Sequence, residues 1–179
     1  MIHASGDFSV KNSVSFSPEA CEIAINALKS GSHILTDTFM AKAAISPMAK
    51  RTLNSEIRCI LEWAPEIIEG NLTSVTRSSL AMKNAWFQLM EMEKCLSRPI
   101  VVIGSAPTAL IELINMIDNG SEKPSLIIGM PVGFIGVSES KTRLAKSGIP
   151  HIILQGSKGG ASLSAAVINA LLRCAESEL

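Results

Sequence analysis

The sequence contains no tyrosine, only three histidines, and four cysteines that lie far apart in its 179 residues. No Cys-x-x-Cys pair occurs among the cysteines, which are Cys21, Cys59, Cys95 and Cys174. That spacing argues against a zinc site and against a disulfide scaffold. Cys59 and Cys95 have apolar sequence neighbours, so we expect both in the core.

Net charge and long apolar runs are also missing. Sixteen basic residues balance sixteen acidic ones, which leaves no electrostatic surface for a nucleic acid or an anionic membrane. No apolar run reaches the roughly 18 residues of a membrane span. The first ten residues, MIHASGDFSV, lack the features of a signal peptide. We therefore expect a cytoplasmic protein with one domain over residues 1–179 and no nucleic-acid or membrane partner.

The apolar runs that are present are short and alternate with helical patterns. Strands are predicted at residues 33–36, 57–61, 99–103, 125–128 and 151–154. Helices are predicted from Pro18 (with Ser17 as the cap) to Gly31, and at residues 37–45, 75–96, 109–117, 138–147 and 161–174. This alternation is typical of βαβ units. It predicts an α/β fold, a flavodoxin-like three-layer α/β/α sandwich with a five-stranded parallel sheet.

Glycine-rich turns follow the last three predicted strands, at residues 104–108, 129–137 and 156–160. In parallel sheets, ligands bind outside the carboxyl ends of the strands, and helix N-termini there favour anions. None of the three turns matches the dinucleotide fingerprint, the phosphate loop or the nucleophile elbow. Both a small-ligand site and ordinary turn chemistry are consistent with these glycines.

Few side chains could supply acid–base chemistry. His33 and His151 each begin a predicted strand, at the end of the sheet opposite the glycine turns, where a structural role is expected. His3 precedes the first helix and can reach the glycine-turn end, although a frayed terminus is the alternative. Asp37 directly follows a strand and either faces the same cleft or caps a helix.

Five stretches together resemble one family. IHASG, TRSS, IGSAPTAL, GMPVGFIGVSESK and QGSKGGASLSAAVINAL, in this order from residue 1 to about 172, resemble precorrin-8X methylmutase of cobalamin biosynthesis. The resemblance implies a flavodoxin-like homodimer that needs no cofactor. It also implies the reaction, which moves a methyl group from C11 to C12 of a tetrapyrrole with many carboxylates. The product is hydrogenobyrinate, or the cobalt-containing cobyrinate.

The same resemblance assigns roles to individual residues. The catalytic histidine of the family motif corresponds to His3, which would act as a proton donor. The arginine of TRS corresponds to Arg77, either a clamp for a substrate carboxylate or a solvated helix residue. The further candidate substrate-binding residues are Asp37, Gly104, Ser105, Thr108, Gly129, Gly133, Lys141, Gly159, Gly160 and Ser162. Helix capping is an alternative explanation for most of the polar ones.

One feature departs from the family pattern. Family members usually carry a leading helical segment with a serine and an arginine that contact substrate, and this sequence starts at Met1 without it. Two functions are therefore expected as alternatives: an isomerase with His3 as the acid, or a non-catalytic protein that binds a corrinoid or another polyanion.

Overall fold

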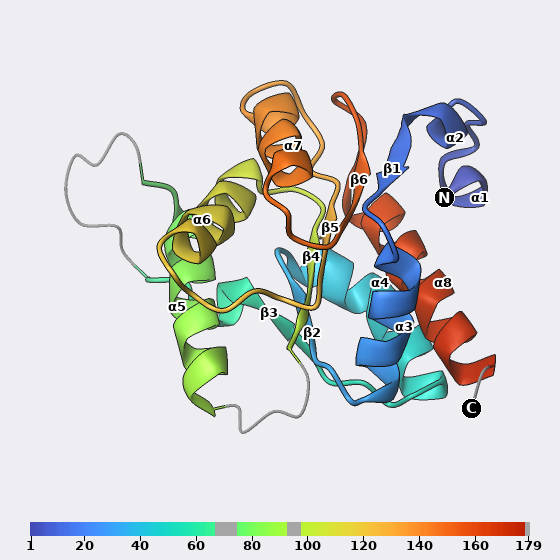
Figure 1. Cartoon of the computed structure of the whole chain (residues 1–179), viewed down its shortest axis with the longest axis horizontal. Coiled ribbons are helices and arrows are strands. Elements are labelled where there is room, and N and C mark those ends of the chain that lie inside the picture. The colour runs from blue at the N-terminus through green and yellow to red at the C-terminus, as the bar shows by residue number, and fades with distance from the viewer. Residues whose placement is uncertain (67–74, 93–97, 178–179) are drawn as a thin grey trace.

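A six-stranded sheet forms the centre of the molecule (Figure 1). The computed structural model describes residues 1–66, 75–92 and 98–177. The strands lie in the order β1 (Val14–Phe16), β6 (His151–Leu154), β5 (Leu126–Gly129), β4 (Ile100–Ile103), β2 (Ile34–Thr36) and β3 (Ile57–Cys59). The last five are parallel to their neighbours, and β1 is antiparallel to β6.

The prediction of a five-stranded, fully parallel sheet is wrong because of β1. All five predicted strands are present and parallel, but a sixth lies outside β6 and pairs Val14 with Leu154. β1 is only three residues long and is flanked by polar residues, so its apolar signal is short. The sheet is therefore mixed.

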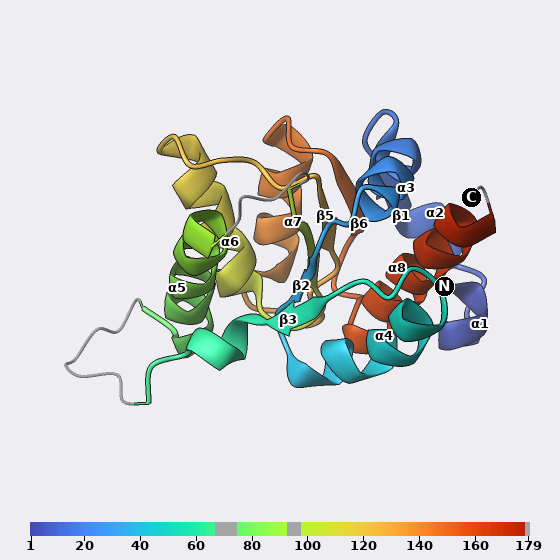
Figure 2. The ribbon, with the colours of Figure 1, turned by 90° about the horizontal axis from the view of Figure 1, so that it is seen from below.

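Three helices cover each face of the sheet (Figure 2). One face packs against α3 (Ala20–Lys29), α4 (Phe39–Arg51) and α8 (Ala161–Ser177), and the other against α5 (Arg77–Met92), α6 (Pro107–Asp118) and α7 (Val137–Lys146). Alternate strand residues point to opposite faces. Val102 and Ile128 accordingly belong to the first core, whereas Val101 and Ile127 belong to the second.

Several boundaries differ from the prediction by a few residues, and the strand predicted at residues 57–61 ends at Cys59, where a 3-10 turn begins. The first long helix begins at Ala20, and the predicted cap Ser17 instead accepts a hydrogen bond from the His151 N–H at 2.8 Å. The helix expected to end near residue 45 continues through Pro47 to Arg51. Cys59 is buried as expected. Cys95 and the predicted helix end at Leu96 lie outside the described residues.

Short elements complete the chain. The helices α1 (Ile2–Ser5) and α2 (Val10–Ser13) precede β1, and a 3-10 turn, η1 (Ile60–Trp63), follows β3. Figure 1 shows α1 and α2 beside β1, close to the turn between β6 and α8. Within the described part of the chain, every helix is too short or too polar to span a membrane.

The carboxyl ends of the parallel strands define one edge of the sheet. Gly104 follows β4, Gly129 ends β5, and Gly156 follows β6, so all three turns lie at this edge, as predicted. Numbered along the chain, the parallel strands run 2-1-3-4-5, and the winding direction reverses between β2 and β4. Ligands of doubly wound sheets bind at such a switch point.

Candidate functional site

Hydrogen bonds join the three glycine turns into one continuous surface. The Val132 N–H donates to the Gly104 carbonyl at 3.2 Å, which links the turns after β4 and β5. Gly133 donates to the Ser157 carbonyl at 3.0 Å, and Gly160 donates to the Met130 carbonyl at 2.9 Å. These two bonds link the turns after β5 and β6. The carboxyl edge is therefore a pre-formed platform.

Three of the predicted glycines are required by close packing. A Cβ on Gly159 would lie 2.0 Å from the Met130 carbonyl oxygen, and a Cβ on Gly104 would lie 2.8 Å from the Ala161 nitrogen. A Cβ on Gly129 would lie 2.5 Å from the Leu144 side chain. These contacts agree with the turn-chemistry alternative, since each glycine lets backbone approach its neighbours.

Asp37 sits at the switch point, directly after β2. Its side chain is 1 % exposed, and its Oδ2 accepts hydrogen bonds from the N–H groups of Gly104, Ser105 and Ala106 at 3.0, 2.6 and 2.8 Å. Burial raises the pKa of the Asp37 carboxyl, while the three N–H donors act in the opposite direction. Asp37 thus caps the turn before α6, and the N–H groups of Gly104, Ser105 and Ala106 are satisfied by its carboxylate.

This result changes how an anion could be recognised. Helix N-termini at this edge were expected to favour anions, but three N–H groups of the turn after β4 already donate to Asp37. The N–H groups of Gly133 and Gly160 likewise donate to carbonyls of neighbouring turns. A ligand carboxylate would therefore depend mainly on side chains at the rim.

Lys141, in α7, forms hydrogen bonds that hold the turn after β6. The side chain is 2 % exposed, and its Nζ donates to the carbonyl oxygens of Gly156 and Lys158, both at 2.7 Å. Burial lowers the pKa of Lys141 to about 8. Lys141 therefore holds the turn after β6 in this structure, and its contact with a substrate stays a prediction.

Arg77 begins α5 and is exposed beside a cavity at the same edge. The Thr76 hydroxyl donates to the Thr108 hydroxyl at 2.7 Å, which joins the start of α5 to the first turn of α6. The cavity, of about 390 Å³, opens between these helices and is lined by Val75, Ser79, Leu80, Lys83, Pro107, Thr108, Ile111, Glu112, Asn115, Ile135 and Gly136. Of the predicted binding residues, Thr108 lines this cavity.

The remaining predicted hydroxyls have few contacts. The Ser105 side chain is half-buried behind the Asp37 cap, and Ser162 is exposed in the first turn of α8. Both lie at the carboxyl edge, so the structure is consistent with the proposed location of the site without assigning either a ligand. No group of three or more His, Cys, Asp or Glu side chains that could hold a metal ion occurs within residues 1–66, 75–92 and 98–177.

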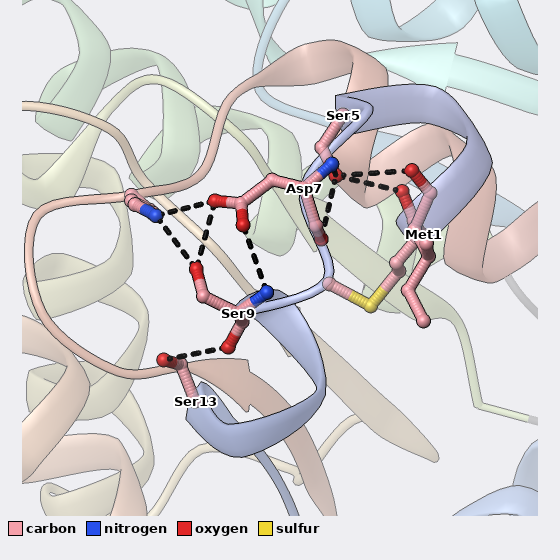
Figure 3. A network of polar contacts seen from close by, with 7 residues as sticks. Met1, Ser5, Asp7, Ser9 and Ser13 are labelled. Carbon is pink, nitrogen blue, oxygen red and sulfur yellow. Dashed lines mark hydrogen bonds and ion pairs between the residues drawn. The ribbon is translucent and has the colours of Figure 1, made fainter.

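His3 is exposed in α1, and a local network orders the segment that follows it (Figure 3). The Asp7 carboxylate accepts hydrogen bonds from the Ser9 N–H and hydroxyl, both at 2.8 Å. The Ser5 hydroxyl accepts from the Asp7 N–H at 3.1 Å and donates to the Met1 carbonyl at 3.2 Å. These bonds order residues 1–9 locally.

The other two histidines occupy the opposite edge of the sheet. His151 is buried at the start of β6, with its Nδ1 2.7 Å from the Ile149 carbonyl oxygen. His33 precedes β2 and lies 3.6 Å from a Glu56 carboxylate oxygen. Both positions match the structural role expected from the sequence, and the segment that contains His3 lies close to the turn between β6 and α8 (Figure 1).

One contact at this edge was missed by sequence reasoning. Lys158, in the turn after β6, donates to Asp7 Oδ2 at 2.5 Å and to the Ser9 hydroxyl at 3.0 Å. The hydrogen bond from Lys158 lowers the pKa of Asp7 to about 2. Because some 150 residues separate the partners, no local pattern could have indicated the pair.

Known proteins resemble this chain over nearly its whole length. The family model for precorrin-8X methylmutase matches residues 1–174. A cobalt-precorrin-8 methylmutase of Priestia megaterium is 35% identical over 177 residues, which cover 99% of this chain and 76% of that protein. A precorrin-8X methylmutase of Pseudomonas aeruginosa is 38% identical over 173 residues, covering 96% and 79%.

A solved structure shows the same fold. The precorrin-8X methyl mutase of Thermus thermophilus superimposes with a TM-score of 0.83 at 34% identity, covering 99% of this chain and 83% of that one. Sequence and structure therefore agree over the elements that form the carboxyl edge. The chain belongs to the precorrin-8X methylmutase family.

Proposed function

We propose that this protein is an isomerase that moves a methyl group from C11 to C12 of precorrin-8X or cobalt-precorrin-8, in cobalamin biosynthesis. The observation that supports this most strongly is the match of residues 1–174 to the precorrin-8X methylmutase family. The flavodoxin-like order of the five parallel strands and the switch point at Asp37 are consistent with a ligand site at the carboxyl edge.

The proposed reaction is an isomerisation without net redox change. The bond from C11 to the methyl carbon breaks, the bond from that carbon to C12 forms, and the double bonds of the macrocycle rearrange. His3 is proposed to donate a proton to the macrocycle, which withdraws electron density from the migrating centre, and to recover it afterwards. A proton donor that works near neutral pH is what histidine supplies.

Substrate carboxylates are proposed to pair with side chains at the rim of the platform. Arg77 is the leading candidate because its guanidinium can hold a carboxylate through two parallel hydrogen bonds. Its position at the start of α5, next to Thr108 and the cavity, supports this role. Backbone N–H groups contribute less, since the ones described above are already bonded within the protein.

The flat face of the macrocycle is proposed to rest on the loop between β5 and α7. Phe134 and Ile135 are 93 % and 92 % exposed at the tip of this loop, and Ile135 also lines the cavity beside Arg77. Exposure of two large apolar side chains is costly unless a ligand or partner covers them. Their continuity with the cavity supports the substrate as that ligand.

Conversion of substrate tests the proposed function directly. Purified protein is mixed with excess precorrin-8X, and with cobalt-precorrin-8 in a parallel experiment, and the absorption spectrum is followed. An isomerase changes the chromophore of many substrate molecules per protein molecule. A spectral change that stops at one equivalent would identify a binding protein instead. Light scattering of the same sample tests the homodimer, which is part of this proposal.

A further inference from the structure

The segment that contains His3 is attached to the glycine platform at a defined point. Asp7 lies four residues after His3, just beyond α1, and the helix is capped by Gly6, whose φ of 62° is left-handed. The Asp7 carboxylate then accepts from Lys158 at 2.5 Å, and the Ser9 hydroxyl accepts from the same Nζ at 3.0 Å. These contacts link the two ends of the sequence.

The platform end of this link is held rigidly. The carbonyl of Lys158 itself accepts from the buried Lys141 Nζ at 2.7 Å. Its neighbours are also fixed, since the Ser157 carbonyl accepts from the Gly133 N–H and the Gly160 N–H donates to Met130. The backbone of Lys158 is therefore part of the same bonded surface as the turns after β5 and β6.

The other end of the link is ordered as well. Ser9 donates to the Asp7 carboxylate through both its N–H and its hydroxyl, and these two bonds fix the orientation of the carboxylate that accepts from Lys158. Further along, the Gln155 N–H donates to the Ser13 carbonyl at 2.8 Å, which continues the β1–β6 pairing. Ser13 and Val14 thus lie beside the end of β6, which leads to Lys158.

We propose that the ion pair between Lys158 and Asp7 is a positioning device, which holds the His3 segment in register with the glycine platform. This inference rests on the proposed function of His3 as the acid. Lys158 acts through Asp7 and is a positioning residue in this scheme. A displacement of about 1 Å at a reacting group can cost on the order of a hundredfold in rate, so a tether at this point affects the chemistry.

If the Lys158–Asp7 ion pair served only to stabilise the fold, its removal would lower the melting temperature. The positioning role predicts otherwise. Both side chains are partly exposed, and exposed ion pairs contribute little to the free energy of unfolding. Removal of the pair should therefore leave the melting temperature almost unchanged. A loss of rate without a loss of stability distinguishes positioning from a general contribution to folding.

The experiment compares three single substitutions. Lys158→Met removes the charge and keeps the length of the side chain, and Lys158→Arg keeps the charge. Lys146→Met changes an exposed lysine at the end of α7, at the edge of the sheet opposite the glycine turns. Single-turnover conversion of precorrin-8X, product affinity, melting temperature and hydrogen exchange of residues 1–13 are measured for each.

We expect Lys158→Met to convert substrate about ten- to a hundredfold more slowly, with product affinity changed less than the rate. Lys158→Arg should recover most of the rate, and Lys146→Met should match the wild type. Among the three single variants, only Lys158→Met should show faster exchange at residues 1–13 than the wild type. The double variant Asp7→Asn/Lys158→Met should be no slower than Lys158→Met, because both substitutions break the same contact.

Wild-type conversion rate in Lys158→Met would overturn the positioning role. Failure of the wild type to convert substrate would instead reject the proposed function. Hydrogen exchange would then show whether the Lys158–Asp7 ion pair holds residues 1–13 in place. Unchanged exchange of residues 1–13 in Lys158→Met overturns the proposal in either case.

Discussion

At the scale of single residues, Asp37 shows how a protein carboxylate can occupy a place that seemed suited to a ligand. Its Oδ2 accepts from three consecutive N–H groups in the turn before α6, and its Oδ1 is buried without a hydrogen-bond partner among the described residues. From the sequence, Asp37 could either face the cleft or cap a helix. The side chain makes the contacts of a cap, and its geometry depends on a turn more than sixty residues away.

Replacement of Asp37 by Asn should destabilise the protein by about 1–3 kcal/mol, because an amide oxygen is a weaker acceptor for three N–H groups than a carboxylate. Urea unfolding measures this change. Asp118→Asn, which removes a charge from an exposed pair with Arg143, should cost less than about 1 kcal/mol. Equal effects of the two substitutions would contradict the assigned role of Asp37.

Arg77 is expected to contribute to binding. Arg77→Ala should weaken product affinity by roughly 1.5–3 kcal/mol, the usual loss for a charge-assisted hydrogen bond. Titration of the product, followed by absorption, gives the affinity. The matched control is Arg143→Ala in α7, an arginine already paired with Asp118. If both variants bind product as the wild type does, Arg77 is a solvated helix residue.

His3 is expected to contribute to rate. His3→Ala should convert precorrin-8X about 10²–10⁴ times more slowly in a single turnover, the usual contribution of one proton donor. Product affinity should change only a few-fold, since the proposed carboxylate contacts lie elsewhere. An unchanged rate in His3→Ala would assign the acid to another residue.

At the scale of elements, the accuracy of prediction followed the length of the apolar signal. The five parallel strands and six long helices could be predicted because each strand is a short β-branched run next to a helical period. β1 could not, since a three-residue strand has little signal and its partner β6 is far away in the sequence. Helix α4 was predicted too short because Pro47, which is exposed, usually ends a helix.

The candidate site was predictable in location and less so in its contacts. Gly104, Gly129 and Gly156 follow parallel strands, and this rule alone places them at one edge. The partners of Asp37, Lys141 and Lys158 lie in other turns, and such pairs depend on how the turns pack. Sequence patterns describe neighbours along the chain, so these contacts required the structure.

An added methyl group in the turn after β6 should destabilise the protein more at Gly159 than at Gly156. Gly159→Ala brings a Cβ to within 2.0 Å of the Met130 carbonyl oxygen, so the turns after β5 and β6 must separate. We expect a loss of about 3 kcal/mol or more in the free energy of unfolding, at the upper end for overpacking. Gly156→Ala, in the same turn with a φ of 74° and open space, should cost about 1 kcal/mol. A loss of stability in Gly159→Ala no larger than that in Gly156→Ala would contradict the close approach of Gly159 to the Met130 carbonyl.

At the scale of the whole molecule, stability should depend on pH through Lys141. Burial lowers its pKa to about 8 in the native state, from the ordinary value of 10.5. Between these values the unfolded chain binds a proton that the native protein does not, so the contribution of Lys141 to the free energy of unfolding rises with pH across this window. It reaches its full value above the unfolded pKa and is lost as the pH falls through about 8.

Comparison with Lys141→Met isolates that contribution, because methionine does not titrate and all other groups are shared. The difference in unfolding free energy between wild type and variant should grow in favour of the wild type by roughly 1–3 kcal/mol from pH 7 to pH 10.5. Denaturant unfolding at several pH values gives this difference. A constant difference would show that Lys141 keeps its ordinary pKa in the native state.

The antiparallel strand β1 has a consequence for the order in which the protein is built. Val14 of β1 pairs with Leu154 of β6, so β1 cannot join the sheet until β6, the last of the six described strands, has been made. Contacts between such distant segments form slowly, since a long loop must close first. The βαβ units between them can assemble earlier, during synthesis. Because β1 directly follows the segment that contains His3, this segment can reach its place beside the sheet only after β6 has been made.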